Sequence, residues 1–279
     1  MAPVIVGGST AMRFIGDNSL QWESSHTLRL VLCFLFAILM QIDANFVNDY
    51  FDWKKGTDRE DRLGPERACA QGWVTPSAMK RAIIIVTILS CLAGLPLIIW
   101  GGWQLIIIGL LCVVFCFLYT TSISYLGLGD ILVVLFFGIV PVCFTHYVLT
   151  GQWSLTIIAI ALSQGLVTDC LLMINNYRDR NQDRESGKRT IVVRFGPRFA
   201  LRTYYLLGII AVIISGAATL HQTHHCLPLL IFLPFVALHT HTHHRMTQLD
   251  GRALNAILGQ TARNIFVYAL LLSAIILIG

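Results

Sequence analysis

Long apolar runs limit the folds that are open to this chain. The segment Leu28–Val47, LRLVLCFLFAILMQIDANFV, is almost uninterrupted, and several other runs approach the roughly 20 apolar residues that span a bilayer. With 56% hydrophobic residues, 13% charged residues and a mean hydropathy of +0.69, the chain carries more apolar surface than a soluble fold could bury. The alternating pattern typical of membrane barrels is absent. We therefore predict an all-α, polytopic membrane protein with the lipid bilayer as its partner.

Nine apolar segments lead us to expect nine transmembrane helices in a single membrane domain covering residues 1–279. The first segment is the weakest candidate, because it is short and contains Arg13. The predicted ranges are 2–16, 27–53, 77–100, 103–120, 126–150, 154–177, 198–220, 226–240 and 261–279.

The positions of the lysines and arginines predict the orientation. Seven lie between Lys54 and Arg81, eight lie between Arg178 and Arg202, and the opposite connections at 101–102, 151–153 and 221–225 have none. By the positive-inside rule the charged loops are cytoplasmic. The net charge of +5 then describes a basic cytoplasmic face and does not indicate nucleic-acid binding. The eight cysteines form no CxxC pair, so we expect buried free thiols rather than a zinc site or disulfides.

An acidic stretch follows the apolar run of the second predicted helix. The sequence NDYFDWKKGTDRED, Asn48–Asp61, holds five carboxylates in fourteen residues. On the preceding helix Gln41, Asn45, Asn48 and Asp52 are four, three and four residues apart, which places them on one stripe. Polar side chains at membrane depth normally face a bundle interior. Asp43 points the other way and is assigned no role.

A second acidic stretch, NNYRDRNQDRESGKRT, begins at Asn175, 127 residues after Asn48. Both stretches share the frame N-x-Y-x-D at the same end of an apolar helix. Asn175, Asp179 and Asp183 are four residues apart and lie on one helix face. Asp58 lies six residues beyond Asp52 and is expected in a loop after the helix. We interpret the two stretches as an internal duplication whose copies meet across a cavity.

Facing carboxylates repel one another unless a cation lies between them. Mg²⁺ fits, because it binds carboxylate oxygens and completes its shell with water and substrate phosphate. Two acidic sets predict two ions bridged by a diphosphate. Basic residues beside each set would contact phosphate oxygens, and an apolar tail could lie in the bundle. These residues are Lys54, Lys55, Arg59, Arg62, Arg67, Arg178, Lys188 and Arg189.

The two acidic motifs resemble the signatures of the UbiA superfamily of intramembrane prenyltransferases, over about residues 1–279. The stretches GPERACAQGWVTPSAMKRA (Gly64–Ala82) and LGLGD (Leu126–Asp130), and the NNYRD…GKRT form, resemble its 1,4-dihydroxy-2-naphthoate branch. The resemblance implies nine helices around a central cavity, in the bacterial inner membrane, with the site facing the cytoplasm. It implies Mg²⁺-dependent transfer of a polyprenyl group from polyprenyl diphosphate to 1,4-dihydroxy-2-naphthoate, with loss of CO₂ and diphosphate, giving demethylmenaquinone for menaquinone biosynthesis.

The resemblance also implies roles for individual residues. The expected metal ligands are Asn48, Asp49, Asp52, Asp58, Asn175, Asp179 and Asp183, of which Asp52, Asp58, Asp179 and Asp183 are the expected catalytic residues. The expected substrate-binding residues are Lys54, Arg62, Arg67, Tyr119, Tyr177, Lys188 and Arg189. Two of the chain's departures from the family pattern concern charged residues. It has no lysine or arginine between Arg81 and Arg178, and it has Asp130 where Glu is expected.

Two other functions fit part of the pattern. One is a prenyltransferase of the same superfamily with another aromatic acceptor, such as 4-hydroxybenzoate or a phytyl or quinone precursor. The other is an ion-coupled transporter, although its polar residues would lie near the membrane centre rather than at one face. The segment HTHTHHR, His239–Arg245, has histidines at helical spacing that could bind metal. We expect it instead to be a solvated segment at the membrane interface.

Overall fold

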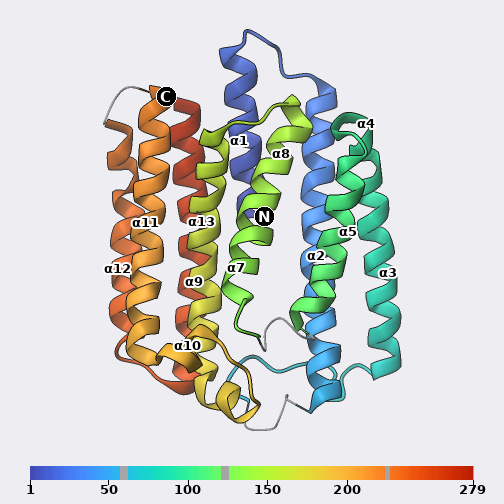
Figure 1. Cartoon of the computed structure of the whole chain (residues 1–279), viewed down its shortest axis with the longest axis vertical. Helices are drawn as coiled ribbons and strands as arrows, with labels where there is room; N and C mark the ends of the chain where they lie inside the picture. The colour runs from blue at the N-terminus through green and yellow to red at the C-terminus, as the bar shows by residue number, and fades with distance from the viewer. Residues whose placement is uncertain (57–61, 121–125, 224–226, 279) are drawn as a thin grey trace.

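The computed structural model describes residues 1–56, 62–120, 126–223 and 227–278. The helices run side by side along the long axis of the molecule (Figure 1). The described residues contain no strand, so the all-α prediction is confirmed. The helices are α1 (Ala2–Asp17), α2 (Ser24–Lys55), α3 (Pro76–Gly94), α4 (Ile98–Gly101), α5 (Gln104–Leu118), α7 (Gly129–Val134), α8 (Val140–Thr150), α9 (Leu155–Glu185), α10 (Ile191–Phe195), α11 (Pro197–Thr223), α12 (Leu233–Met246) and α13 (Asn255–Ile278). Shorter helical turns are η1 (Leu95–Leu97), η3 (Leu135–Ile139), η4 (Leu227–Phe232) and η5 (Gly251–Leu254).

Every predicted span has a helical counterpart among the described residues, but the count of nine crossings is not confirmed. Six helical stretches there are long and apolar enough to cross a membrane. The helix Gln104–Leu118 is shorter, and α1 and α12 have 16 and 14 residues. The membrane prediction therefore holds, while the number of full crossings stays a prediction.

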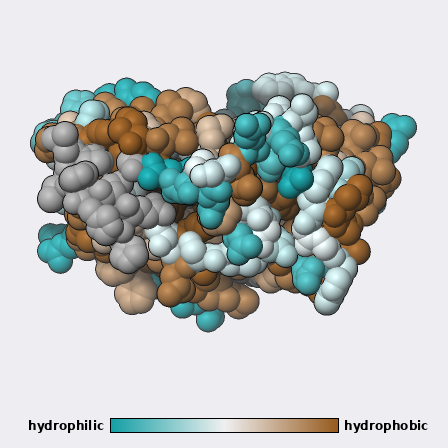
Figure 2. Space-filling model, turned by 90° about the horizontal axis from the view of Figure 1, so that it is seen from above, coloured by the Kyte–Doolittle hydropathy of each residue, from teal (hydrophilic) through white to brown (hydrophobic). Residues whose placement is uncertain are grey.

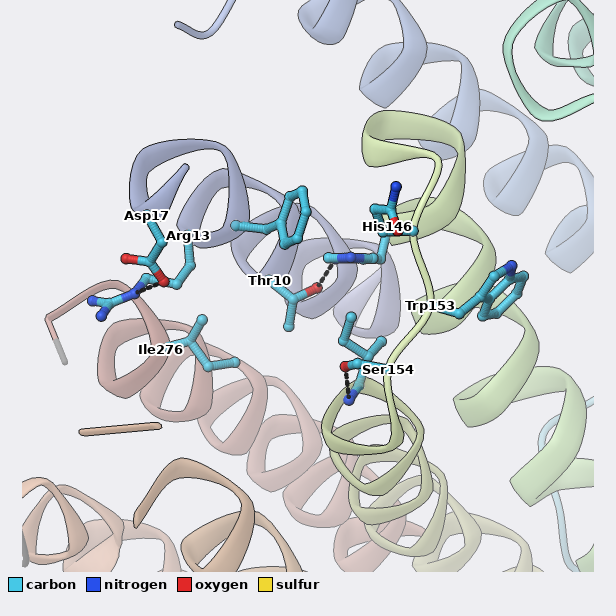
Figure 3. A pocket seen from close by; sticks show the side chains of 10 residues that line it. Thr10, Arg13, Asp17, His146, Trp153, Ser154 and Ile276 are labelled. Carbon is cyan, nitrogen blue, oxygen red and sulfur yellow. Dashed lines mark hydrogen bonds and ion pairs between the residues drawn. The ribbon is translucent and has the colours of Figure 1, made fainter. Parts of the chain in front are cut away.

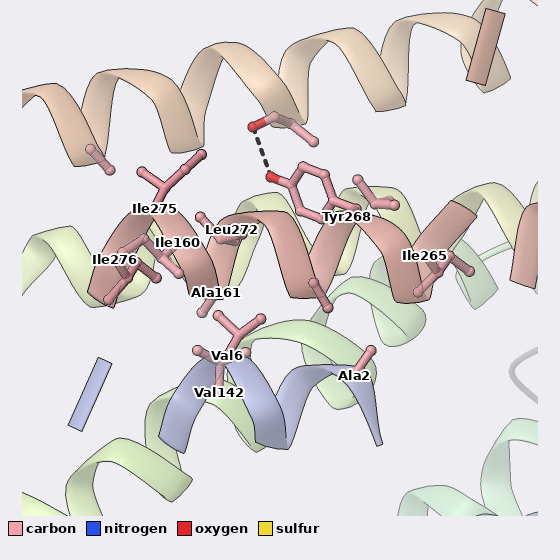
Figure 4. Close-up of a cluster of buried hydrophobic side chains, with 14 of the residues drawn as sticks. Ala2, Val6, Val142, Ile160, Ala161, Ile265, Tyr268, Leu272, Ile275 and Ile276 are labelled. Carbon is pink, nitrogen blue, oxygen red and sulfur yellow. Dashed lines mark hydrogen bonds between the residues drawn. The ribbon is translucent and has the colours of Figure 1, made fainter. Parts of the chain in front are cut away.

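The bundle has two halves joined by a central pair of helices. Helices α9, α11, α12 and α13 pack together on one side, and α2, α3 and α5 pack on the other (Figure 1). Between them, α1 contacts α8 and α13, and α8 contacts α2. The largest buried cluster lies where α1, α8, α9 and α13 meet, and includes Val6, Val142, Ile160 and Leu272 (Figure 4). Tyr268 in this cluster donates its hydroxyl to the hydroxyl of Ser215 on α11 at 2.9 Å.

A contact between two glycines holds the centre of the bundle together. A Cβ added to Gly138 on η3 would overlap the backbone of Gly165 on α9, so the two helices touch main chain to main chain. Small residues allow this close approach in membrane bundles, where dispersion contacts drive helix association. The η3 segment is a π-helical turn just before Pro141, and such turns bend a helix.

Helices α2 and α9 both finish at one end of the bundle, which we call the acidic end (bottom of Figure 1). Helix α2 is terminated by Gly56, whose φ of +67° is left-handed and suits glycine. Helix α9 continues to Glu185, eight residues beyond the predicted 177, because Asn175, Asp179 and Asp183 keep helical spacing.

The opposite end carries the α1–α2 and α8–α9 connections. Seen from this end, apolar side chains form much of the outer margin and polar ones are gathered mainly inside it (Figure 2). Exposed apolar residues such as Ile99, Leu110 and Ile213 lie on the walls of the bundle. An outer surface of this kind suits contact with lipid.

A small pocket lies at the opposite end, between α1, α8, the start of α9 and the end of α13 (Figure 3). Its volume is about 90 Å³, and an Arg13–Asp17 ion pair of 2.8 Å lies beside it. Thr10 donates its hydroxyl to the Gly7 carbonyl, so the 3.1 Å contact with His146 requires Nδ1 to be the donor. The buried Nε2 of His146 is then an acceptor without a hydrogen-bond partner.

The histidine segment differs from the expectation of a solvated stretch. Helix α12 continues through it to Met246, and His239 is buried. The His239 ring stacks on Tyr204 with centroids 4.9 Å apart, and its Nε2 lies 3.2 Å from the Tyr205 carbonyl oxygen. The expectation is wrong for His239 because aromatic partners on α11 bury it.

Candidate active site

The two acidic motifs meet at the acidic end, around Arg62. This residue follows α2, and its side chain is half-buried. Burial lowers the pKa of the Arg62 guanidinium and nearby Arg67 lowers it further, whereas the carboxylates of Asp52 and Asp179 raise it. Asp52 belongs to α2 and Asp179 to α9, so carboxylates from both motifs act on one guanidinium. The structure therefore brings together the two predicted halves of the site.

Asp183 and a pair of lysines extend this cluster. The charges of Asp179 and Asp52 both act on Asp183, one turn further along α9. Lys188, in the turn after α9, lies 3.6 Å from the Asp183 carboxylate. Lys55, at the end of α2, is close enough for its charge to interact with those of Asp52 and Lys188. Positive side chains from both halves thus lie beside the acids.

A network of hydrogen bonds ties the loop after α2 to the other half of the bundle. Arg178 donates to both carboxylate oxygens of Asp179, at 2.7 and 2.6 Å, and to the side-chain oxygen of Asn255 at 2.8 Å. Asn255, at the start of α13, donates to the Leu63 carbonyl at 2.8 Å. A Cβ on Gly64 would come within 2.8 Å of the Arg178 guanidinium, so glycine lets the loop lie against it. This network holds Arg62 over the end of α9.

Asp49 has a different environment from the other acids of its motif. Its side chain is 7% exposed, and its two carboxylate oxygens accept the backbone N–H groups of Ala68 and Cys69, both at 2.9 Å. These contacts fasten the loop that carries Arg62 and Arg67 onto α2.

The end of α5 is fastened to the first motif. The Thr120 hydroxyl donates to the side-chain oxygen of Asn48, and Lys55 donates to the Thr120 carbonyl at 3.1 Å. The charges of the Asp183 and Asp52 carboxylates act on the hydroxyl of Tyr119, the residue before Thr120. Tyr119 therefore lies near acids of both motifs, and its expected role in substrate binding stays a prediction.

The remaining predicted residues have less specific surroundings. Lys54 is exposed, and the half-buried Arg67 has a buried Nε without a hydrogen-bond partner. Arg189 is exposed, and its carbonyl oxygen packs against Gly127. Tyr177 is buried among apolar residues of α9, α10 and α11 with Arg180 over its ring at 4.7 Å, which indicates a packing role. Asn175 is half-buried one turn before Asp179 on α9, and Asp58 and Arg59 lie outside the described residues.

The donor set is one that Mg²⁺ can use. Within the part of the chain that the structure describes, no three Asp, Glu, His or Cys side chains come together as a complete metal-binding group. Mg²⁺ commonly needs only one or two carboxylates, because waters and substrate phosphates complete its octahedron. Asp52, Asp179 and Asp183 supply hard oxygen donors of this kind. They fit an ion whose binding depends on the diphosphate.

Sequence reasoning missed several residues that shape the site. Thr120 and Asn255 belong to no charged motif, and their partners lie 72 and 77 residues away. Asp43, which had no assigned role, accepts a hydrogen bond of 2.8 Å from Thr87 on α3. Asp169 sits within an apolar run of α9, and an acid at such a depth was a signal in itself.

Comparisons with known proteins agree with this geometry. The profile of the UbiA prenyltransferase family matches residues 2–270. The chain is 34% identical over 268 residues to the 1,4-dihydroxy-2-naphthoate octaprenyltransferase of Escherichia coli strain K12, which covers 92% of this chain and 87% of the relative. It is 38% identical over 178 residues to the Haemophilus influenzae protein of the same name, covering 61% of this chain and 58% of the relative.

The fold is also similar to a solved structure. A UbiA homologue from Archaeoglobus fulgidus, bound to DMAPP and Mg²⁺, superposes with a TM-score of 0.62 at 16% identity, covering 99% of this chain and 95% of the other. At that identity the likeness establishes the fold.

Proposed function

The chain belongs to the UbiA prenyltransferase family, and on this basis we propose that it transfers a polyprenyl group from polyprenyl diphosphate to 1,4-dihydroxy-2-naphthoate. Diphosphate and CO₂ leave, and demethylmenaquinone is formed for menaquinone biosynthesis. The family match runs through residues 2–270, which supports treating residues 1–279 as one prenyltransferase domain.

The observation that carries this proposal is the meeting of Asp52 and Asp179 at Arg62, whose loop packs through Gly64 against the Arg178 guanidinium that binds Asp179. A site with carboxylates from two helices and cations between them suits a metal-bound diphosphate. From the site towards the opposite end, the helices that position it are apolar, so a prenyl chain can extend into the bundle. A transporter would not need such a cluster at one end.

Each charged side chain has a role in diphosphate binding. Asp52, Asp179 and Asp183 hold Mg²⁺, with Asn48, Asn175 and Asp58 as further ligands, and the Archaeoglobus fulgidus homologue bound to DMAPP and Mg²⁺ supports this cofactor. Bound Mg²⁺ neutralises charge on the leaving diphosphate as a Lewis acid. Arg62, Lys188 and Lys55 donate to the diphosphate oxygens, with Lys54, Arg67 and Arg189 around them. The number of ions is two if each motif binds one.

Asp49 takes a supporting role in this proposal. Asp49 is buried and both of its oxygens accept backbone hydrogen bonds, so it positions the loop of Arg62 and Arg67 instead of binding metal directly. The Asp179 carboxylate, which Arg178 binds, is 25% exposed and so remains open to a metal. Water exclusion completes the mechanism, because the apolar helices protect the allylic cation from hydrolysis until the electron-rich ring attacks it.

The acidic end faces the cytoplasm of a bacterial inner membrane in this proposal. The loops there contain the groups of seven and eight basic residues, and cytoplasmic loops are enriched in lysine and arginine. Labelling of single cysteines introduced at exposed positions such as Gln71 and Gln152, from each side of sealed vesicles, tests this orientation.

The direct test is prenyl transfer in membranes that contain this protein. Membranes receive Mg²⁺, a labelled polyprenyl diphosphate and a panel of aromatic acids that includes 4-hydroxybenzoate. We expect labelled product and CO₂ with 1,4-dihydroxy-2-naphthoate, and none when EDTA removes Mg²⁺. Product with another acid alone would reassign the acceptor. The absence of any prenylated product would overturn the proposal.

A further inference from the structure

Two buried aspartates lie deeper in the bundle than the acidic motifs and have no role in the proposed diphosphate binding. Asp130 is the second residue of α7 and is 8% exposed, and Asp169 on α9 is 3% exposed. The Oδ1 atom of each has no hydrogen-bond partner. Among the described residues no lysine, arginine or histidine forms an ion pair with either carboxylate.

The packing of α7 against α9 places these two acids together. Gly138 and Gly165 bring the backbones into direct contact, and Leu172 on α9 packs against Gly129. Asp169 lies between Gly165 and Leu172 along α9, and its charge and that of Asp130 act on each other. The start of α7 is held in place because Arg194 donates to the Leu126 carbonyl at 2.7 Å.

Tyr119 connects this buried pair with the acidic motifs. Its hydroxyl would lie 3.7 Å from a Cβ on Gly129, the residue before Asp130. The charges of Asp130 and Asp169 act on this tyrosine, and so do those of Asp183 and Asp52. The pair therefore lies within one aromatic side chain of the acidic motifs.

Buried acceptor oxygens without partners are costly, and low dielectric increases the cost. A protein retains such groups where a ligand supplies the missing donors, and intramembrane acids in particular mark functional sites. The missing partner here is a hydrogen-bond donor small enough to enter an apolar bundle beside a bound diphosphate.

We propose that Asp130 and Asp169 bind the hydroxyl groups of the aromatic acceptor and make the enzyme select dihydroxy acids. This inference rests on the proposed function and assigns the acceptor end of that same site. Phenolic hydroxyls donate to carboxylate oxygens, whereas quinone carbonyls cannot. The acceptor's own carboxylate is attracted towards Lys55, Lys188 and Arg62. The acceptor ring thus lies with one hydroxyl group hydrogen-bonded to the aspartates and with its carboxylate facing the cationic side chains.

The test compares two acids that differ by one hydroxyl group. Binding of 1,4-dihydroxy-2-naphthoate and of 1-hydroxy-2-naphthoate is measured by isothermal titration in nanodiscs, with Mg²⁺ and pyrophosphate present. The variants are Asp169→Asn and Asp130→Asn, which keep shape and remove charge. Asp43→Asn is the matched control, because Asp43 is also fully buried with one partnerless oxygen but lies on α2 against Thr87.

We expect the preference of the wild type for the dihydroxy acid to fall about 10-fold or more in both variants, since a hydrogen bond to a charged group is lost. The KM for polyprenyl diphosphate stays unchanged. Thermal stability stays equal or rises, because each variant removes a buried ionisable group that has no cationic partner. The Asp43→Asn variant keeps the wild-type preference.

An unchanged preference in either folded aspartate variant, with the wild type active, overturns this inference and leaves the proposed function intact. Failure of the wild type to prenylate any aromatic acid contradicts the proposed function instead. If Asp169→Asn does not fold, Asp130→Asn at the start of α7 decides the question.

Discussion

Replacing Asp49 by alanine tests whether this motif residue holds a loop or a metal. The substitution leaves the backbone N–H groups of Ala68 and Cys69 without their carboxylate acceptor. A hydrogen bond to a charged group contributes about 1.5–3 kcal/mol, so two contribute about 3–6 kcal/mol. Ala68 is half-buried and its N–H can bind water, so we expect a net loss of about 3 kcal/mol. The loss falls on the loop between α2 and α3.

Hydrogen–deuterium exchange of the protein in nanodiscs measures this loss locally. A change of about 3 kcal/mol in opening free energy makes the amides of residues 66–74 exchange about 100-fold faster. The KM for polyprenyl diphosphate should rise, because Arg62 and Arg67 lose their position, while the Mg²⁺ concentration for half-maximal activity stays the same. Asp250→Ala, at an exposed carboxylate of the same end, is the control. A raised Mg²⁺ requirement with unchanged exchange would refute our reasoning and make Asp49 a metal ligand.

Three further predictions concern the site and its frame. Asp52→Ala and Asp179→Ala should each lower turnover by about 100-fold or more without preventing insertion, since each removes a carboxylate that holds the Mg²⁺ needed to stabilise the leaving diphosphate. Substantial turnover at normal expression would argue against these roles. Asn255→Ala removes the side chain that joins Arg178 to the Leu63 carbonyl, so kcat/KM should fall about 10-fold. Asn18→Ala at the opposite end is the control. Equal activity of the two variants would contradict a role for Asn255 in holding the site. Gly165→Val places a Cβ 2.7 Å from the Val134 carbonyl oxygen and should destabilise the bundle by about 1–3 kcal/mol. The control Gly109→Val, where a Cβ would have no atom within 4 Å, should leave stability unchanged. Thermal unfolding in detergent measures the stability of both variants.

Much of the fold could be predicted because apolar runs of about bilayer length indicate membrane-spanning helices directly. The first and last residues of the helices were less predictable. Helix α9 continues to Glu185 because the second motif has helical spacing in a polar stretch, where hydropathy gives no signal. Helix α13 begins at Asn255, six residues before the predicted 261, and its first turn holds the site network. Polar first and last turns outside the apolar core are where such predictions fail.

The part of the candidate site that comes from the repeated N-x-Y-x-D motif could be predicted from the sequence. The part that depends on partners far away in the sequence could not. The N-x-Y-x-D frame identified Asp52 and Asp179, because helix periodicity converts spacing into a shared face. The same frame could not distinguish Asp49 from Asp52, since the backbone donors of Ala68 and Cys69 come from a loop. His239 looked solvated for a similar reason, because its stacking partner Tyr204 is on another helix. Tertiary contacts decided each of these cases.

The affinity for an unreactive polyprenyl thiolodiphosphate with Mg²⁺ tests most directly whether both motifs bind one head group. It is measured in nanodiscs for the wild type, Asp52→Asn, Asp179→Asn and the double variant. If the motifs share the ligand, each single variant binds at least about 10-fold more weakly, and the double variant loses less than the sum of the two free energies. Wild-type affinity in either single variant would contradict a shared site.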